Sequence, residues 1–388
     1  MPKVLLSDAQ QRKTLAVTRS LGKRGLQIIA ADRTRFTPTA CSKYCYKHIV
    51  SPDPHSKEDE YLSWIKKTLL DNNCQIFIPM DDDAFFLAVK HRDELEKLCL
   101  MPLPASESYF CAADKGKAMV KAREAGLCCP LTMNITDLQQ VYEFSEDMKY
   151  PLIIKPRISS GSRGIRKVSC KEELIAEYIK IHSQYPWPMI QQYIEPKNRY
   201  DVCLLYDRNG ELKASFVQKE IRNFPINWGP STVQESVENP ELLDMSLKLM
   251  QLLPWQGIVE IEFMENKADG QMFFMEINPR FWASVQMAIF AGIDFPWLLY
   301  QTMIDEPVEY VSSYRTGIKC KWTFPGEILH FLFNKQRRNM DPPFLSGKKQ
   351  LVYDDMYSPD DPLPVLGFFL AAARYVFDKN MWQKILFR

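Results

Sequence analysis

The sequence has little of what marks a secreted, membrane-spanning or disulfide-rich protein. Its longest apolar run, 365–373, is too short to cross a bilayer, because a spanning helix needs about 20 apolar residues. The N-terminus turns polar after a short apolar stretch and lacks the apolar core of a secretory signal. Its ten cysteines are scattered and form no CxxC pair. Reduced thiols and a cytoplasmic location are therefore expected.

An excess of charge of one sign is also lacking. The chain has 49 Lys and Arg against 48 Asp and Glu, which gives a net charge of +1. A nucleic-acid partner is disfavoured, because such proteins carry a basic surface, and any anion site must be local. The dinucleotide motif GxGxxG and the phosphate loop GxxxxGK[ST] are absent too. These absences argue against a nicotinamide cofactor and a P-loop ATPase.

The composition that remains is ordinary for a globular protein, with 46% hydrophobic residues. The length of 388 residues predicts about two to three domains. Strand-like and helix-like segments alternate at the start of the chain, and they cover residues 4–6, 14–23, 28–32, 61–70 and 75–79. This order is typical of an α/β domain with a parallel sheet. Beyond a Pro- and Ser-rich stretch at 102–108 the pattern becomes α+β. We expect four parts, which are 1–113, 114–190, 191–310 and a C-terminal extension over 311–388.

A glycine- and serine-rich turn lies inside the second part, between two strand-like segments. Its candidate residues are Ser160, Gly161, Ser162, Arg163 and Gly164. Glycines let backbone N–H groups turn towards an anion, while serine hydroxyls add donors. Lys115 and Lys155 would supply point charges for phosphate oxygens. The segment predicts a phosphate cradle, and a solvent-exposed turn is the alternative.

A second pattern predicts an antiparallel hairpin. Strand-like segments 257–264 and 271–280 flank a turn with Asp269 and Gly270 at its tip. A register centred on that turn pairs Glu262 with Glu276 across the two strands. The same register pairs Glu260 with Asn278, and all four side chains then share one face.

Two carboxylates opposed across a strand pair repel each other, so a cation is expected between them. Glu262, Glu276 and Asn278 offer the oxygen ligands that suit Mg²⁺, which commonly binds one or two carboxylates together with nucleotide phosphates. A solvated polar face screened by Lys or Arg is the alternative. Arg280 points to the same face and could hold a substrate carboxylate or a transferring phosphoryl group.

In this order the motifs resemble the ATP-grasp superfamily, and most closely its carboxylate–amine ligase branch. The resemblance covers residues 1–310, and it is carried by Asp114-Lys115, KPRISSGSRGI, IQQYIE, EIEF and MEINPRFWAS. It implies a Rossmann-like pre-ATP-grasp domain followed by a two-lobed ATP-grasp domain, as in biotin carboxylase, carbamoyl phosphate synthetase and D-alanine ligase. The implied reaction joins a carboxylate to an amine through an acyl phosphate and releases ADP and phosphate.

The resemblance also implies roles for individual residues. Lys115 and Lys155 would contact the ATP phosphates, and the loop from Ser160 to Gly164 would close over them as a lid. The adenine hinge would be Gln191, Gln192, Tyr193 and Ile194, although the family usually has Glu at the first of these positions. Asp201 is a candidate ribose ligand. The metal, Mg²⁺ or Mn²⁺, would be held by Glu262, Glu276 and Asn278.

Four further residues are predicted to act in catalysis. Arg280 would stabilise the acyl phosphate or the tetrahedral intermediate, and Ser284 follows it by one helical turn. Lys219 and Arg222 would face the acyl or phosphoryl group, with Ser231 and Thr232 towards the substrate. A basic edge strand is the alternative for this segment.

Two other functions stay open at this stage. One is a carboxylase or carbamoyl-type enzyme that uses bicarbonate, and the other is a nucleotide-binding protein without turnover. The expected partners are small-molecule substrates, and a homodimer is a common habit of the family. The tail 362–388 could form a basic amphipathic helix on an anionic membrane, but packing on the domain or on a partner subunit is the favoured interpretation.

Overall fold

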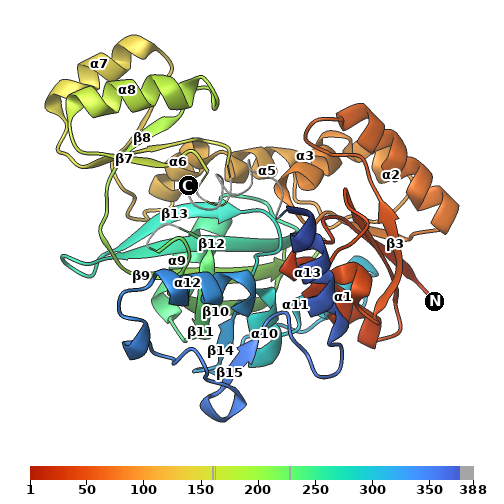
Figure 1. Ribbon diagram of the computed structural model, residues 1–388. Coiled ribbons are helices and arrows are strands. Elements are labelled where there is room, and N and C mark those ends of the chain that lie inside the picture. Colours follow the sequence, from red (N-terminus) through yellow and green to blue (C-terminus); the bar gives the residue numbers. More distant parts are fainter. Residues whose placement is uncertain (160, 162, 227–228, 376–388) are drawn as a thin grey trace.

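A computed structural model describes the chain except for residues 160, 162, 227–228 and 376–388 (Figure 1). Ser160 and Ser162 of the predicted phosphate cradle, and the end of the C-terminal tail, therefore lie outside the described residues. The fold is mixed α/β. It contains a four-stranded sheet, a second four-stranded sheet and a seven-stranded sheet, in chain order.

The N-terminal sheet is parallel, as predicted. Its strands are β1 (Lys3–Leu6), β2 (Gln27–Asp32), β3 (Cys45–Val50) and β4 (Ile76–Ile78), in the order β3-β2-β1-β4. The helices of this part are α1 (Arg12–Lys23), α2 (Glu58–Asn72), α3 (Asp82–Lys90) and α4 (Arg92–Leu95). The sequence pattern misses β3, because this edge strand is half-exposed and has no apolar run.

The second sheet forms a separate lobe at the top left of Figure 1. It consists of β5 (Thr132–Asn134), β6 (Leu152–Lys155), β7 (Arg166–Val168) and β8 (Met189–Gln192), in the order β5-β8-β6-β7. Two helices, α7 (Leu138–Asp147) and α8 (Lys171–His182), pack on it around a small apolar core. β6 and β7 are antiparallel, which confirms the hairpin predicted on either side of the glycine-rich turn.

The seven-stranded sheet has the order β13-β12-β9-β10-β11-β14-β15. Its strands are β9 (Pro196–Tyr206), β10 (Leu212–Asn223), β11 (Ser231–Ser236), β12 (Gly257–Asn266), β13 (Met272–Asn278), β14 (Lys319–Lys321) and β15 (Val352–Asp354). One face packs on α5 (Ser106–Ala113), α6 (Lys115–Glu124) and α9 (Pro240–Met250). The other face packs on α10 (Val285–Ala291), α11 (Phe295–Met303) and the N-terminal sheet.

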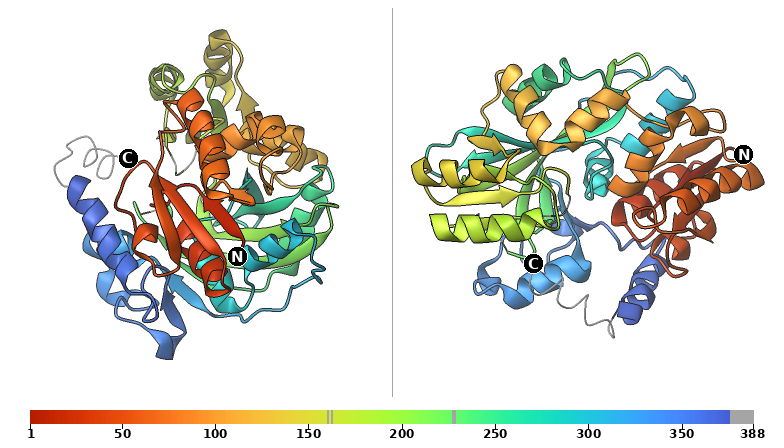
Figure 2. Two further views of the ribbon diagram at one scale, coloured as in Figure 1. Left: turned by 90° about the vertical axis from the view of Figure 1, so that its right-hand side faces the viewer. Right: turned by 90° about the horizontal axis from the view of Figure 1, so that it is seen from above.

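The C-terminal extension closes one side of the molecule (Figure 2). It contributes β14 and β15 to the large sheet and adds α12 (Ile328–Phe333) and α13 (Leu363–Tyr375). Buried ion pairs join it to α1, one between Arg12 and Asp355 and one between Arg19 and Asp361. Within the described residues, no helix is long and apolar enough to cross a membrane. The division of the chain at 113, 190 and 310 stays a prediction.

Candidate active site

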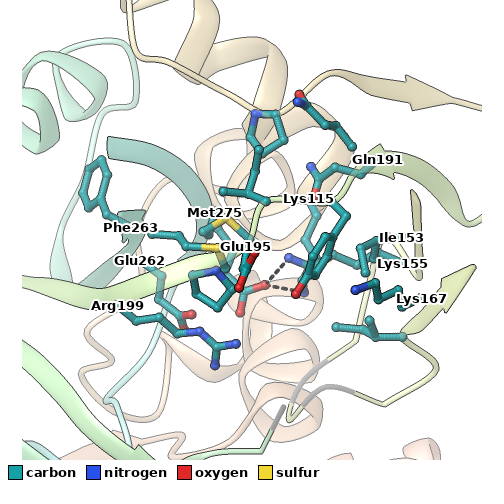
Figure 3. Close-up of a pocket in the computed structure, with 18 of the residues that line it drawn as sticks. Lys115, Ile153, Lys155, Lys167, Gln191, Glu195, Arg199, Glu262, Phe263 and Met275 are labelled. Carbon is teal, nitrogen blue, oxygen red and sulfur yellow. Dashed lines mark ion pairs between the residues drawn. The ribbon is translucent and has the colours of Figure 1, made fainter. Parts of the chain in front are cut away.

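A cavity of about 550 Å³ lies between the second sheet and the edge of the large sheet. Figure 3 shows its polar centre, with Lys155 from the second sheet, Lys115 from the start of α6 and Glu262 from the large sheet. The hinge residues Gln191, Gln192, Tyr193 and Ile194 all line it, as predicted for one wall of an adenine site. The apolar part of the wall comes from Ile153, Ile165, Phe263, Met264 and Met275.

The hinge explains how glutamine replaces the usual glutamate. Gln191 is buried, and its Nε2 donates to Thr132 Oγ1 over 2.9 Å. The hydrogen-bond partners of Gln191 among the described residues are the uncharged side chains of Thr132 and Met119, so a neutral amide suits this position better than a buried carboxylate. The backbone N–H of Gln192 donates to the Leu131 carbonyl over 2.8 Å, so it is not a spare donor for a base.

The centre of the cavity is a carboxylate between two lysines. Glu276 Oε2 lies 3.2 Å from Lys155 Nζ and 3.3 Å from Lys115 Nζ. Burial alone would raise the pKa of Glu276, but the two ammonium groups outweigh it and hold that pKa at about 2. Burial lowers the pKa of Lys155, with Lys115 beside it acting in the same direction. The two lysines are thus held together at a buried point, ready for an anion.

The start of α6 fixes Lys115 in this place. The Asp114 side chain caps the helix by accepting hydrogen bonds from the backbone of Gly116 and Lys117. Arg157, which follows β6, binds the same carboxylate through two hydrogen bonds of 3.0 and 2.6 Å. The cap therefore connects α6 to the strand that carries Lys155.

The predicted register of the hairpin is confirmed. Glu262 pairs with Glu276 and Glu260 pairs with Asn278 across β12 and β13. The row continues into β9 and β10, where Asp201 stands opposite Glu262 and Gln218 opposite Asp201. Asn278 Nδ2 donates to Glu262 Oε1 over 2.7 Å and to Glu260 Oε2 over 3.0 Å.

The other carboxyl groups of this row differ from Glu276 in the direction of their pKa shifts. Burial raises the pKa of Glu262 and of Asp201 well above the ordinary value, and neighbouring carboxylates add to the effect. Burial also raises the pKa of Glu260 to about 7. Asp201 is buried and bonded to Gln218, so the structure gives no sign of the predicted contact with ribose.

The donor set fits a hard divalent cation. Glu262, Glu276 and the amide oxygen of Asn278 offer the oxygen ligands that such a cation prefers. Among the described residues, no three His, Cys, Asp or Glu side chains already form a metal cluster. The remaining ligands would have to come from phosphates and water.

Arg280 does not point freely into the cavity. Its Nε donates to Asp82 Oδ1 over 2.5 Å, and its Nη2 lies 3.3 Å from Asn278 Oδ1. Arg280 therefore joins the hairpin of β12 and β13 to the start of α3. Asp81, at the N-terminal end of that helix, makes no capping hydrogen bond and instead accepts from Lys13 Nζ over 3.0 Å.

These contacts reveal a charged cluster that sequence reasoning missed. Asp8 and Asp81 follow β1 and β4, the two neighbouring strands between which the strand order of the parallel sheet reverses. Ligands of open α/β sheets bind at such a point, beyond the carboxyl ends of the strands. Asp8 has a φ of 54°, and burial raises its pKa to about 7. The available signal was the polar turn SDAQQRK directly after the first strand.

The predicted substrate-side residues are only partly brought together. Arg222 donates to Glu327 Oε2 over 2.7 Å, and Thr232 Oγ1 donates to the same carboxylate over 2.7 Å. Both side chains thus hold the C-terminal extension, and the structure does not support the predicted substrate contacts. Ser231 likewise hydrogen-bonds backbone carbonyls. Lys219 Nζ lies 5.9 Å from the centre of the Tyr200 ring.

Ser284 is buried and accepts a hydrogen bond of 2.7 Å from Gln218 Nε2. It therefore orients the amide that also binds Asp201, which is a positioning contact. In the predicted phosphate cradle, Gly161 and Gly164 have φ values of 62° and 74°, which favour glycine. Gly161 lines the cavity. The positive charge of Arg163 opposes the rise that burial causes in the pKa of Asp83, at the start of α3.

The cavity also contains cationic residues that the motifs did not flag. Lys167 Nζ lies 3.7 Å from the centre of the Tyr193 ring, on the hinge side. Arg199 lines the opposite wall and lies 3.7 Å from Glu220. No sequence signal marked either residue, because each is brought in by strand pairing between distant segments.

Comparison with known proteins agrees with this geometry. Residues 114–295 match the family model of the carbamoyl-phosphate synthase L chain, ATP binding domain. Biotin carboxylase 1 of Bacillus subtilis is 25% identical over 191 residues, which cover 46% of this chain and 42% of that protein. Acetyl-CoA carboxylase 1 of Oryza sativa subsp. japonica is 29% identical over 138 residues, 34% of this chain and 6% of that one. The chain thus spans less than half of these curated relatives.

Solved structures share the fold over most of the chain. The biotin carboxylase domain of Hydrogenobacter thermophilus 2-oxoglutarate carboxylase has a TM-score of 0.69 at 17% identity, covering 82% of this chain and 73% of that one. The L-amino acid ligase of Bacillus licheniformis has a TM-score of 0.63 at 15% identity, covering 80% and 75%. Residues 114–295 thus match an ATP-binding domain of the carbamoyl-phosphate synthase type, and the fold resembles that of ATP-grasp proteins of the carboxylate–amine ligase branch.

Proposed function

We propose that this protein is an ATP-dependent ligase that joins a carboxylate to an amine. The observation that carries the proposal is the buried Lys115–Glu276–Lys155 centre, which opens on a cavity of about 550 Å³ walled by the hinge. Two lysines that already share one carboxylate are suited to exchange it for phosphate oxygens. The adjoining row of carboxyl groups is suited to the cation that accompanies a nucleotide.

ATP would lie between the second sheet and the edge of the large sheet. Its base would stack among Ile153, Ile165 and Met275 beside the hinge, and its phosphates would reach Lys115 and Lys155. Mg²⁺, held by Glu262, Glu276 and Asn278, would neutralise charge on the phosphates. The glycine-rich loop after β6 would close over them and exclude water from the acyl phosphate.

The reaction would proceed in two steps. An oxygen of the substrate carboxylate attacks the γ-phosphorus, the bond to the ADP oxygen breaks, and an acyl phosphate forms. The amine then attacks the acyl carbon, phosphate leaves, and a proton is released from the nitrogen. Arg280 would stabilise the charge that develops on the acyl phosphate or the tetrahedral intermediate.

The charged cluster at the end of the parallel sheet would bind the substrates. Arg280 connects the hairpin to Asp82, and Lys13 and Asp81 lie next to it. The cluster contains both signs of charge, which suits substrates that carry a carboxylate and an amine. Which acid and which amine are joined is the question for experiment.

A second candidate is a carboxylase that uses bicarbonate as the acid. It is favoured by one observation, that the matching curated relatives include acetyl-CoA carboxylases and a biotin carboxylase. A nucleotide-binding protein without turnover is the third. The predicted cytoplasmic location and a homodimeric state stay proposals; the 2-oxoglutarate carboxylase domain is described as a dimer.

The test is ADP release from Mg-ATP in the presence of pooled amino acids and small carboxylic acids, with and without bicarbonate. Mass spectrometry then identifies what is consumed. Release that requires an acid and an amine, with a product lighter than their sum by one water, would support the ligase. Release with bicarbonate alone would replace it by the carboxylase. Tight ATP binding without ADP in any pool would favour the protein without turnover.

A further inference from the structure

Helix α13 packs on the protein through its small residues. Pro364, Gly367 and Ala371 are buried on one side of the helix. A Cβ at position 367 would lie 2.6 Å from the Thr37 carbonyl oxygen and 2.8 Å from Cys41 Sγ. The close approach of the helix to the segment Thr39–Cys41 therefore depends on the absence of a side chain at this glycine.

The large apolar residues of α13 point the other way. Leu363, Leu366, Phe369 and Leu370 are each between 44% and 56% exposed. A surface helix normally buries such residues and exposes polar ones. In α13 this arrangement is reversed, so its outer face is an apolar surface without a partner in the described part of the chain.

Other large apolar residues of the extension are exposed as well. The Phe369 ring packs against the Phe324 ring with 5.0 Å between their centres, which places α13 next to the turn that leads into α12. At the end of α12, Leu332 and Phe333 are each 57% exposed. Leu345, in the following loop, is 91% exposed.

Basic residues accompany these apolar ones. Five exposed cations follow α12 and precede β15, namely Lys335, Arg337, Arg338, Lys348 and Lys349. Within the described residues, none of the five forms a salt bridge with an acidic side chain, and Arg337 instead donates to the Leu332 carbonyl. Residues 311–388 contain 12 Lys and Arg against 7 Asp and Glu, although the whole chain carries only +1. The positive charge of the molecule is thus concentrated in the part that exposes large apolar side chains.

We propose that this face of the C-terminal extension binds an anionic lipid surface. Leu363, Leu366, Phe369 and Leu370 enter the boundary between headgroups and acyl chains, while the unpaired cations meet lipid phosphates. The proposal is independent of the ligase reaction, because none of these residues lines the cavity.

A second copy of the chain fits the same face less well. A two-fold interface brings the same patch of both subunits together, so the five cations would face an identical set. Like charges juxtaposed in this way are unfavourable. A bilayer with anionic headgroups offers both the apolar depth and the opposite charge.

The experiment is flotation of the full chain with vesicles of phosphatidylglycerol mixed with phosphatidylcholine, and with phosphatidylcholine alone. We expect flotation with the anionic vesicles at about 0.05 M salt and much less at about 0.5 M salt, because salt screens the cations. Replacing Leu366 and Phe369 together by Glu should lower the bound fraction at least tenfold. The pair Arg337→Glu and Arg338→Glu should do the same.

A matched control changes the same residue types elsewhere. Lys67→Glu with Leu70→Glu alters an exposed cation and an exposed leucine of α2, away from the extension, and should leave flotation unchanged. Each variant should keep the thermal midpoint and ADP release or ATP binding of the original chain. This control separates loss of lipid binding from loss of fold.

Three results would overturn the proposal. The first is no flotation on anionic vesicles at low salt, and the second is equal flotation of the control and extension variants. The third is a dimer in sedimentation velocity that Leu366→Glu dissociates while lipid binding is absent, which would assign the face to a second copy of the chain.

Discussion

The row of acidic side chains across the large sheet divides into two halves that behave in opposite ways. Glu276 lies between Lys115 and Lys155, and its pKa is held at about 2. One strand away, burial raises the pKa of Glu262 and, a strand further, of Asp201. All three are carboxyl groups on the same face of the same sheet.

The difference lies in the cations, and not in the carboxyl groups or their burial. On the proposed function, the half with two lysines would meet the phosphates of a nucleotide. The metal that accompanies the nucleotide would lie where the two halves adjoin, between Glu276 and Glu262.

Glu276→Gln tests the half of the row that lies between the two lysines, and it should have the largest effect. Removing this carboxylate leaves the lysines without their partner and takes one oxygen ligand from the metal. We expect ADP release to fall by roughly a thousandfold or more while the fold survives. The measurement is steady-state ADP release over a range of Mg²⁺ concentrations.

Glu265→Gln is the matched control, because Glu265 lies on β12 and binds Lys197 Nζ at 2.6 Å but does not line the cavity. It should retain ADP release within about tenfold. Near-normal turnover of Glu276→Gln with an unchanged Mg²⁺ requirement would refute the metal assignment.

Glu327→Ala extends the comparison to a buried ion pair away from the cavity. Arg222 would keep its charge but lose its carboxylate, which costs about 3 to 5 kcal/mol of unfolding free energy. Urea denaturation measures this loss. Replacing both residues by Met should recover part of the stability and keep ADP release. A stable double variant without activity would instead support the predicted catalytic role of Arg222.

Asp8→Asn tests another carboxyl group whose pKa burial raises, one that lies at the end of the parallel sheet and not in the row on the large sheet. Folding raises its pKa from 3.8 to about 7 through burial and the nearby Asp81, with Lys13 opposing. The folded state therefore holds a proton that the unfolded state releases, and this contribution to stability is lost as pH rises from about 4 to 7. Asparagine stays neutral and tolerates the positive φ.

The free energy of unfolding of Asp8→Asn, relative to that of the original chain, should therefore rise between pH 4 and 7 by up to about 4 kcal/mol. Above pH 8 this difference should stay constant. Urea denaturation of both proteins at pH 5, 6, 7 and 8 gives the difference. A difference that does not change with pH would show that the pKa of Asp8 is ordinary.

Ser284→Ala should have the smallest effect. The variant removes one acceptor from Gln218, at a cost of about 1 kcal/mol of unfolding free energy. ADP release should stay within about tenfold, because Gln218 still reaches Asp201. A loss of a hundredfold or more would favour the catalytic role that the sequence predicts for Ser284.

The parts of the site that sequence predicts best depend on local rules. Side-chain alternation and the Asp269–Gly270 turn determine which residues of β12 and β13 stand opposite each other, and the pairing of Glu262 with Glu276 follows from them. The hairpin of β6 and β7 is predicted for the same reason. These contacts join residues that are near in sequence.

The parts that sequence misses depend on contacts between distant segments. Arg280 and Asp82 are 198 positions apart, and Arg222 and Glu327 are 105 apart. No periodicity connects such pairs, so each arginine is predicted for catalysis from its place beside a motif. The structure shows that both are tied to other parts of the chain, Arg280 beside the site and Arg222 away from it.

The position of β14 has a consequence for any shortened form of the protein. β11 lies between β10 and β14, and β14 comes from the extension. A chain that ended at residue 310 would leave β11 as an open edge with unpaired backbone N–H and C=O groups. Such edges recruit strands from other molecules and promote aggregation. The extension thus replaces the six-residue strand β11 at the edge of the sheet by the three-residue strand β15, which offers a neighbouring molecule fewer unpaired backbone groups.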